Sequence, residues 1–363
     1  MRSLRQSAIA AAAALCTLAT PALAQVQSYR DIKTPALRQF QMPQPKRIEL
    51  PNGLVIFLQE DRELPLIRGS VTIRGGGRDV PAEKAGLTGI LGQAWRTGGT
   101  ATRTGDQLDE QLESRAAVLE TSADTDSMTV RLNVLKQDLD FVFPIWVDLI
   151  RNPAFRQEKI DLAKTQLNTA ISRRNDEPMQ IALREAAKLA YGASSPYTRQ
   201  AEYSTVAGVT RQDLLDFHKR FVHPNNMIIG FVGDFDSAKL EKQLRDTFGS
   251  LPRGPQAPKP DQSMNPSKPG VYLISKSDVN QSNIVLTHPG TIRNVPEYYS
   301  LLVMNEILSG GFSGRLMNDL RTARGLAYGV SGGVGSEWDR PGLFRLWIGT
   351  KSGSTMEAIE ALR

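Results

Sequence analysis

The chain has 363 residues, a formal net charge of +6 and one cysteine, Cys16. Its 44 basic and 38 acidic side chains are interspersed, which argues against a nucleic-acid-binding surface or a polybasic membrane patch. The length is sufficient for two domains.

Residues 1–24 have the pattern of a secretory signal. Arg2 and Arg5 precede an apolar stretch too short to span a membrane, and a small-x-small pattern ends at Ala24. The alternative, a membrane anchor, is weaker because no second apolar segment follows. We therefore expect cleavage, a periplasmic mature chain without a membrane span, and no disulfide or thiolate metal site, since Cys16 is removed with the signal.

The first part of the mature chain mixes strands and helices. A hairpin is predicted around Pro51-Asn52-Gly53, because this turn joins two apolar runs. Alternation and helical periodicity then predict these elements: a strand at 66–79, helices at 86–99 and 105–114, a strand at 127–135, a long helical region, and a buried strand at 226–234. Thr210 begins one of these helices with a capping box to Asp213. We expect residues 46–250 to form one domain.

Residues 251–270 contain six prolines, which is typical of an extended linker. After them the pattern restarts with strands at 270–275 and 282–290, a helix at 297–310 and two further strands. Residues 271–363 are therefore predicted to be a second, shorter copy of the first architecture, apparently truncated at the C-terminus. The predicted fold class is α+β.

The helix at 86–99 carries an unusual face. Its apolar side chains follow a helical stripe, but the other face offers only Gly89, Gly92 and Gln93. Each glycine in a helix interior costs about 1 kcal/mol relative to alanine. The sequence therefore raises the question of why this face of the helix carries no side chain suited to binding or catalysis.

Ordered motifs along residues 46–363 resemble one peptidase family. These motifs are IELPNGLVIFLQED, SVTIRGGGRD, AGLTGILGQAWRTGG, RNPAF, SRRNDEP, HPNNMIIGFVGDF and, in the second copy, LSGGFSGRLMNDLRTARGLAYGVSG. In this order they resemble the landmarks of the pitrilysin/insulinase-type peptidases, in the branch of mitochondrial processing peptidase. The resemblance implies two homologous insulinase-like (LuxS/processing-peptidase-like) domains.

The resemblance also explains the empty helix face. Active members carry H-x-x-E-H there, two histidines for zinc and a glutamate for its water, with a third ligand from a later helix. The alignment places Gly89 and Gln93 at the histidine positions, Gly92 at the glutamate position and Ala170 at the third ligand. It implies that this chain binds no zinc. The alternative is that small residues let another element pack closely.

Heterodimeric relatives divide the work between two subunits. In such relatives the subunit without zinc supplies an arginine and a tyrosine, and Arg321 and Tyr328 match those positions. The resemblance therefore implies a zinc-bearing partner subunit and a peptide substrate, whose carbonyl these two candidate catalytic residues would hold. The ordinary alternative is an arginine in an ion pair and a tyrosine packing its ring.

The resemblance also predicts where a peptide would bind. The family's peptide-binding sheet edge should lie near 117–126, although Glu120-Thr121 departs from its Asn-Ala pair. We expect the three histidines, His218, His223 and His288, in surface or loop packing rather than in a metal site.

Taken together, these features predict a non-catalytic subunit of a zinc peptidase heterodimer. The alternative is a catalytically dead peptide-binding or scaffold protein of the same fold.

Overall fold

The computed structural model describes Gln39 and residues 41–362 and contains two β-sheets. The predicted signal at 1–24 lies outside these residues. None of the helices in the described part is long and apolar enough to cross a bilayer.

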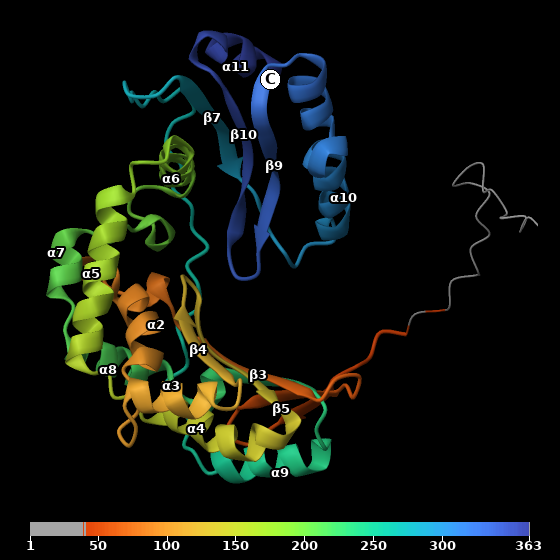
Figure 1. Cartoon of the computed structure of the whole chain (residues 1–363). Helices are drawn as coiled ribbons and strands as arrows, with labels where there is room; N and C mark the ends of the chain where they lie inside the picture. The colour runs from red at the N-terminus through yellow and green to blue at the C-terminus, as the bar shows by residue number, and fades with distance from the viewer. Residues whose placement is uncertain (1–38, 40, 363) are drawn as a thin grey trace, which may run out of the picture. The chain divides into compact units, whose positions relative to one another are not determined.

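The first sheet has six strands in the order β1-β2-β6-β3-β5-β4. Figure 1 labels three of them, β3, β4 and β5. The strands are β1 Lys46–Glu49, β2 Val55–Glu60, β3 Leu66–Arg74, β4 Val118–Ala123, β5 Ser127–Leu135 and β6 Met227–Gly233. The predicted hairpin is confirmed, since β1 pairs antiparallel with β2 and Gly53 takes the left-handed conformation in the turn at φ +90°. β3 lies between β5 and β6 and pairs antiparallel with both of them.

Helices cover one face of this sheet. The helices that contact its strands are α2 Leu87–Thr97, α3 Gly105–Glu113, α4 Leu139–Arg151 and α9 Ser237–Phe248. α5 Gln157–Arg173 and α8 Arg211–Phe221 pack on α2, and α7 Tyr203–Gly208 packs on α5. α6 Pro178–Tyr191 packs instead on a strand of the second sheet, Gln281–Pro289. Alternate strand residues such as Ile67, Val71 and Ile73 point into this core, where Trp95 and Trp146 are fully buried. The predicted capping box of Thr210 and Asp213 is present at the start of α8.

The opposite face of the first sheet is open. The prediction that the strand at 226–234 is buried was wrong, because only alternate residues of β6 are covered. Ile228 and Val232 are 43% and 39% exposed. They lie on the face that none of the helices packing onto the core covers, beside a groove lined by Phe57, Arg68 and Arg131 among others.

The second sheet has four strands in the order β7-β10-β9-β8. They are β7 Gln281–Pro289, β8 Thr291–Ile292, β9 Ala327–Glu337 and β10 Pro341–Lys351. Helix α10 Tyr298–Ser309 packs against β9, and α11 Thr355–Leu362 packs against β10 (Figure 1). The fold class is α+β with a repeated architecture, as predicted.

One predicted strand of the second copy does not form. Residues 270–275 are irregular, although their sequence alternates like a strand. Val271 and Leu273 are 90% and 92% exposed. The local sequence favours an extended chain, but no neighbouring strand in the described residues pairs with it, and a strand needs a partner for its backbone groups.

Candidate functional site

Helix α2 is built as the apolar stripe predicts. Gly86 precedes it at φ +103°, a left-handed conformation that favours glycine. Leu87, Ile90 and Leu91 are buried, and the indole nitrogen of Trp95 donates a 2.7 Å hydrogen bond to the carbonyl of Leu149. The helix is therefore fixed to the core along one side, and the other side presents the zinc-motif positions.

Three of the four zinc-motif positions are exposed and chemically empty. Gly89 and Gln93 lie on the outer face of α2, and Ala170 is exposed on α5, which packs against α2. A Cβ built on Gly89 would meet no atom within 4 Å. Glycine and alanine carry no ligand atom, and a glutamine amide is a poor ligand for zinc. Within residues 41–362, no cluster of three His, Cys, Asp or Glu side chains is arranged to hold a metal ion.

Gly92 is different from Gly89. A Cβ on Gly92 would lie 2.8 Å from the backbone nitrogen of Ala123 on β4, closer than real Cβ atoms approach. The Thr121 hydroxyl donates to the Gly92 carbonyl at 2.8 Å and accepts from the Arg96 backbone N–H at 3.1 Å. The close-packing alternative therefore holds at Gly92, whereas Gly89 faces open space.

Arg96 strengthens the same contact between α2 and β4. Its Nε donates to the Leu119 carbonyl at 2.9 Å, and its Nη2 contacts the Asp109 carboxylate at 2.6 Å. The sequence analysis missed Arg96 and Thr121 as a pair. The only sequence signal for this contact is a threonine in a strand after the helix. Many strands contain a threonine, so the signal is not specific. The donor set of this region fixes helix to strand and does not fit zinc.

Strand β4 lies at the edge of the six-stranded sheet, as expected for the segment at 117–126. It pairs with β5 on one side only, and the side chains of Val118, Glu120 and Ser122 are exposed. An unpaired edge presents backbone donors and acceptors to an extended peptide. Peptide binding at this edge stays a prediction.

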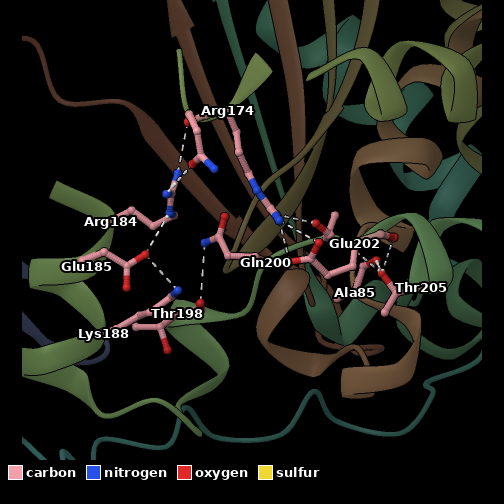
Figure 2. Close-up of polar contacts among 11 residues, drawn as sticks. Ala85, Arg174, Arg184, Glu185, Lys188, Thr198, Gln200, Glu202 and Thr205 are labelled. Carbon is pink, nitrogen blue, oxygen red and sulfur yellow. Dashed lines mark hydrogen bonds and ion pairs between the residues drawn. The ribbon is translucent and has the colours of Figure 1, made fainter. Parts of the chain in front are cut away.

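Polar contacts hold the loop that approaches the start of α2. Figure 2 shows Arg174, at the end of α5, reaching toward Glu202. The Arg174 guanidinium donates to the two Glu202 carboxylate oxygens at 2.6 and 2.7 Å and to the Ala201 carbonyl at 2.9 Å. The Thr205 hydroxyl then donates to the carbonyl of Ala85 at 2.8 Å, just before α2. The ion pair is half-exposed, so its role is to position the loop rather than to add much stability.

The carboxylate of Glu185 on α6 is also held by neighbouring basic side chains (Figure 2). The Glu185 carboxylate accepts from Lys188 at 3.0 Å and from Arg184 at 3.2 Å. Partial burial raises the pKa of Glu185, but hydrogen bonds from Lys188 and Arg184 outweigh burial and hold that pKa below its usual range. Glu185 is therefore an ionised structural group and a poor general base.

Arg321 and Tyr328 lie in the second copy. Arg321 belongs to a π-helical turn, Met317–Ala323, and its guanidinium lies 5.3 Å from the ring centroid of Phe312. Tyr328 is on β9 and is 77% exposed. No hydrogen bond or ion pair in the described residues joins either side chain to the other or to α2. In the described part of the chain, Arg321 therefore forms no ion pair, and the ring of Tyr328 is not packed in a core.

The histidines do not gather at a site. His218 is buried, which contradicts the expectation of surface packing: its Nε2 lies 2.8 Å from the Ile150 carbonyl, and its ring packs edge-on to Trp95. Burial lowers the pKa of His218 to about 4. His288 is exposed and stacks on Phe344 at 4.5 Å.

Comparison with known proteins identifies the family. The model of the insulinase family (peptidase family M16) matches residues 56–197, and that of the peptidase M16 inactive domain matches residues 208–363. An uncharacterized zinc protease of Mycobacterium leprae is 28% identical over 291 residues, 78% of this chain and 64% of the relative. One of Rickettsia felis is 24% identical over 307 residues, 83% of this chain and 72% of the relative. The chain thus spans about two thirds of the length of these relatives.

Solved structures agree on the fold. A peptidase M16 inactive domain from Pseudomonas fluorescens has a TM-score of 0.76 at 23% identity, over 87% of this chain and 77% of that one. A protease from Helicobacter pylori has a TM-score of 0.76 at 18% identity, over 88% of this chain and 79% of that one. The two family models, the fold and the absence of the zinc motif support the same family assignment. The chain belongs to the insulinase-type (M16) peptidase family, as a member that lacks the zinc motif.

Proposed function

We propose that this chain is the non-catalytic subunit of a periplasmic zinc peptidase heterodimer. The observation that carries the proposal is the contrast between two sets of residues. Gly89 and Ala170 carry no ligand atom, and Gln93 carries only an amide, a poor ligand for zinc. Arg321 and Tyr328 keep their donor groups, and within the described residues neither of them forms an ion pair or lies in the core. A chain that had lost all connection with proteolysis would have no reason to keep the second set free.

The chemistry assigned to the pair is electrostatic. A guanidinium holds a peptide carbonyl with a fork of N–H donors, and a phenol hydroxyl donates a hydrogen bond to an oxygen that gains negative charge. Zinc and its water belong to the partner subunit in this proposal. The chain contributes the two donors and a wall of the substrate chamber, and the β4 edge is its candidate surface for an extended peptide.

The test is peptide hydrolysis by a candidate zinc-bearing partner, titrated with this protein. Activity is expected to rise to saturation near one-to-one. It is expected to fall about 10²–10³-fold when the carbonyl-binding donor is removed by Arg321→Ala. Arg324→Ala is the matched control, because Arg324 lies in the same turn but pairs with Asp319 at 3.0 Å.

Tyr328→Phe tests the second donor, and Tyr299→Phe is its control because Tyr299 is also 77% exposed. Unchanged activity in both Arg321→Ala and Tyr328→Phe would favour the alternative, a peptide-binding or scaffold protein of the same fold. Hydrolysis by this chain alone that a chelator stops would overturn both readings.

A further inference from the structure

The guanidinium of Arg321 lies over an aromatic ring. Its central carbon is 5.3 Å from the ring centroid of Phe312. This distance is within the range of about 6 Å at which the face of a ring attracts a cation. Among residues 41–362 no ion pair or side-chain hydrogen bond of this guanidinium is formed. The ring is therefore the partner of the charge in the described part of the chain.

Arg324, three residues further along the same turn, is held in a different way. Its Nε donates to the Asp319 carboxylate at 3.0 Å. An ion pair of this kind occupies N–H donors and offsets the positive charge. A ring face attracts the cation without offering it an acceptor oxygen. The contact with Phe312 therefore places the Arg321 guanidinium and leaves its charge and its fork of donors available.

The loop that carries Phe312 is tied to the turn that carries the arginine. Phe312 belongs to a single 3₁₀ turn, Gly311–Ser313. Asn318, in the π-helical turn, donates from its side chain to the Ser313 carbonyl at 3.0 Å and from its backbone N–H to the Gly314 carbonyl at 3.0 Å. One hydrogen-bonded unit thus positions both the ring and the guanidinium.

Core packing does not account for the place of Phe312. The side chain is 74% exposed and lies outside the buried cluster of the second sheet. Little apolar surface is removed from water at this position, so the ring contributes little to the stability of the fold. Its contact with Arg321 is the interaction that gives the ring a function.

We propose that Phe312 is a positioning residue for Arg321. The ring holds the guanidinium in one place while its N–H donors stay free for a substrate carbonyl; this inference rests on the proposed function. A long arginine side chain loses rotamer freedom when it is fixed on an oxygen. A guanidinium that already lies on a ring loses less of this freedom when it binds, so the donor is preorganised.

The first test needs no partner subunit. In the full chain with isotope-labelled arginine, the NMR resonance of the Arg321 Nε–H is assigned by its loss in Arg321→Lys. The ring current of Phe312 displaces this resonance, and Phe312→Leu is expected to return it to the position of a free arginine. Phe312→Tyr keeps a ring face and leaves it displaced, as does the matched control Tyr299→Leu on α10. A resonance that Phe312→Leu does not move overturns the proposal.

The second test uses peptide hydrolysis with the zinc-bearing partner. Phe312→Leu is expected to lower kcat about two- to fivefold, the ratio that corresponds to the free energy of an exposed cation–π contact. KM and the amount of chain needed for saturation stay unchanged, and Phe312→Tyr restores kcat. In the Arg321→Ala background Phe312→Leu has no further effect, because no guanidinium is left to hold.

The outcomes separate this inference from the proposed function. An equal loss with and without Arg321, or a loss that Phe312→Tyr does not restore, would mean that the ring only shapes its loop. That result overturns the positioning role and leaves the proposed function intact, as does unchanged kcat in Phe312→Leu when Arg321→Ala is impaired. Unchanged activity in Arg321→Ala overturns the proposed function and this inference with it.

Discussion

Gly89 and Gly92 lie one turn apart on α2 but meet different surroundings. The first faces open space, and the second lies under the backbone of β4. The resemblance places the family's glutamate at position 92, where β4 leaves no room for a Cβ, and a zinc ligand at position 89, where a side chain would have room.

We predict opposite effects for the same substitution at these two glycines. Gly89→Ala should stabilise the fold by up to about 1 kcal/mol, because alanine favours helix and meets no atom. Gly92→Ala should destabilise it by about 1–3 kcal/mol, because its Cβ forces β4 away. Urea unfolding of the two variants checks this, and equal effects would contradict the geometry.

His218 gives the fold a dependence on pH. Burial lowers the pKa of His218 from 6.5 to about 4, so between these values the unfolded chain binds more protons than the folded one. Stability should fall as the pH drops from about 6.5 to about 4, by about 3 kcal/mol in total from this residue. In His218→Gln, whose amide still donates to the Ile150 carbonyl, that part of the slope should vanish; an unchanged slope in urea unfolding across this pH range would assign it to other groups.

At the scale of elements, the Thr121 hydroxyl joins β4 to α2 beside the contact that Arg96 makes with the Leu119 carbonyl. We predict that Thr121→Val costs about 1–2 kcal/mol, because it removes two hydrogen bonds of the Thr121 hydroxyl in a partly buried place, one to the Gly92 carbonyl and one from the Arg96 backbone N–H. Hydrogen exchange in β4 should accelerate as well. Ser122→Ala, at the exposed next residue, should change neither quantity, and a similar loss in both variants would remove Thr121 from its role.

Local sequence patterns predicted most helices and strands, but they did not predict which elements lie beside one another in space. The hairpin, β3, α2 and β5 follow from turn residues and periodicity within each segment. The open face of β6 and the irregular 270–275 segment depend on which other elements lie beside them, and no local pattern carries that information. The same holds at the site: the empty positions on α2 were predicted, but the β4 backbone over Gly92 was not.

The geometry predicts how far a zinc site can be rebuilt on α2. Gly89→His with Gln93→His places two imidazoles at i and i+4 on an open face, which should bind zinc measurably, in contrast to the unaltered chain. Ala170→Glu should tighten binding if α5 places it as the family resemblance implies. Hydrolysis should stay absent, because β4 closes position 92 to the glutamate that activates water. Competition with a chromophoric chelator measures affinity, and Gln93→His alone is the control.

At the scale of the whole molecule, the two sheets bury very different cores. The second sheet's buried cluster is small: Leu320, Leu326, Ala327, Val330, Ile348 and Ala358. The cluster around the first sheet is several times larger and contains Trp95 and Trp146. Burial of apolar area stabilises by about 25 cal/mol per Å², so the region around the second sheet should open at lower free energy.

Limited trypsin digestion should therefore attack the chain in a defined order. No helix or strand forms between Phe248 and Gln281. Arg253 and Lys276 are the trypsin sites of this stretch, because Lys259 and Lys268 precede prolines and are not cut. We expect early cleavage there, then loss of the C-terminal part, and survival of a fragment ending near Arg253. Native-state hydrogen exchange should show the same order, with β9 and β10 less protected than β3 and β5. Equal protection of the two sheets would mean that the few buried residues of the second sheet are stabilised by the rest of the molecule, so that both sheets unfold as one cooperative unit.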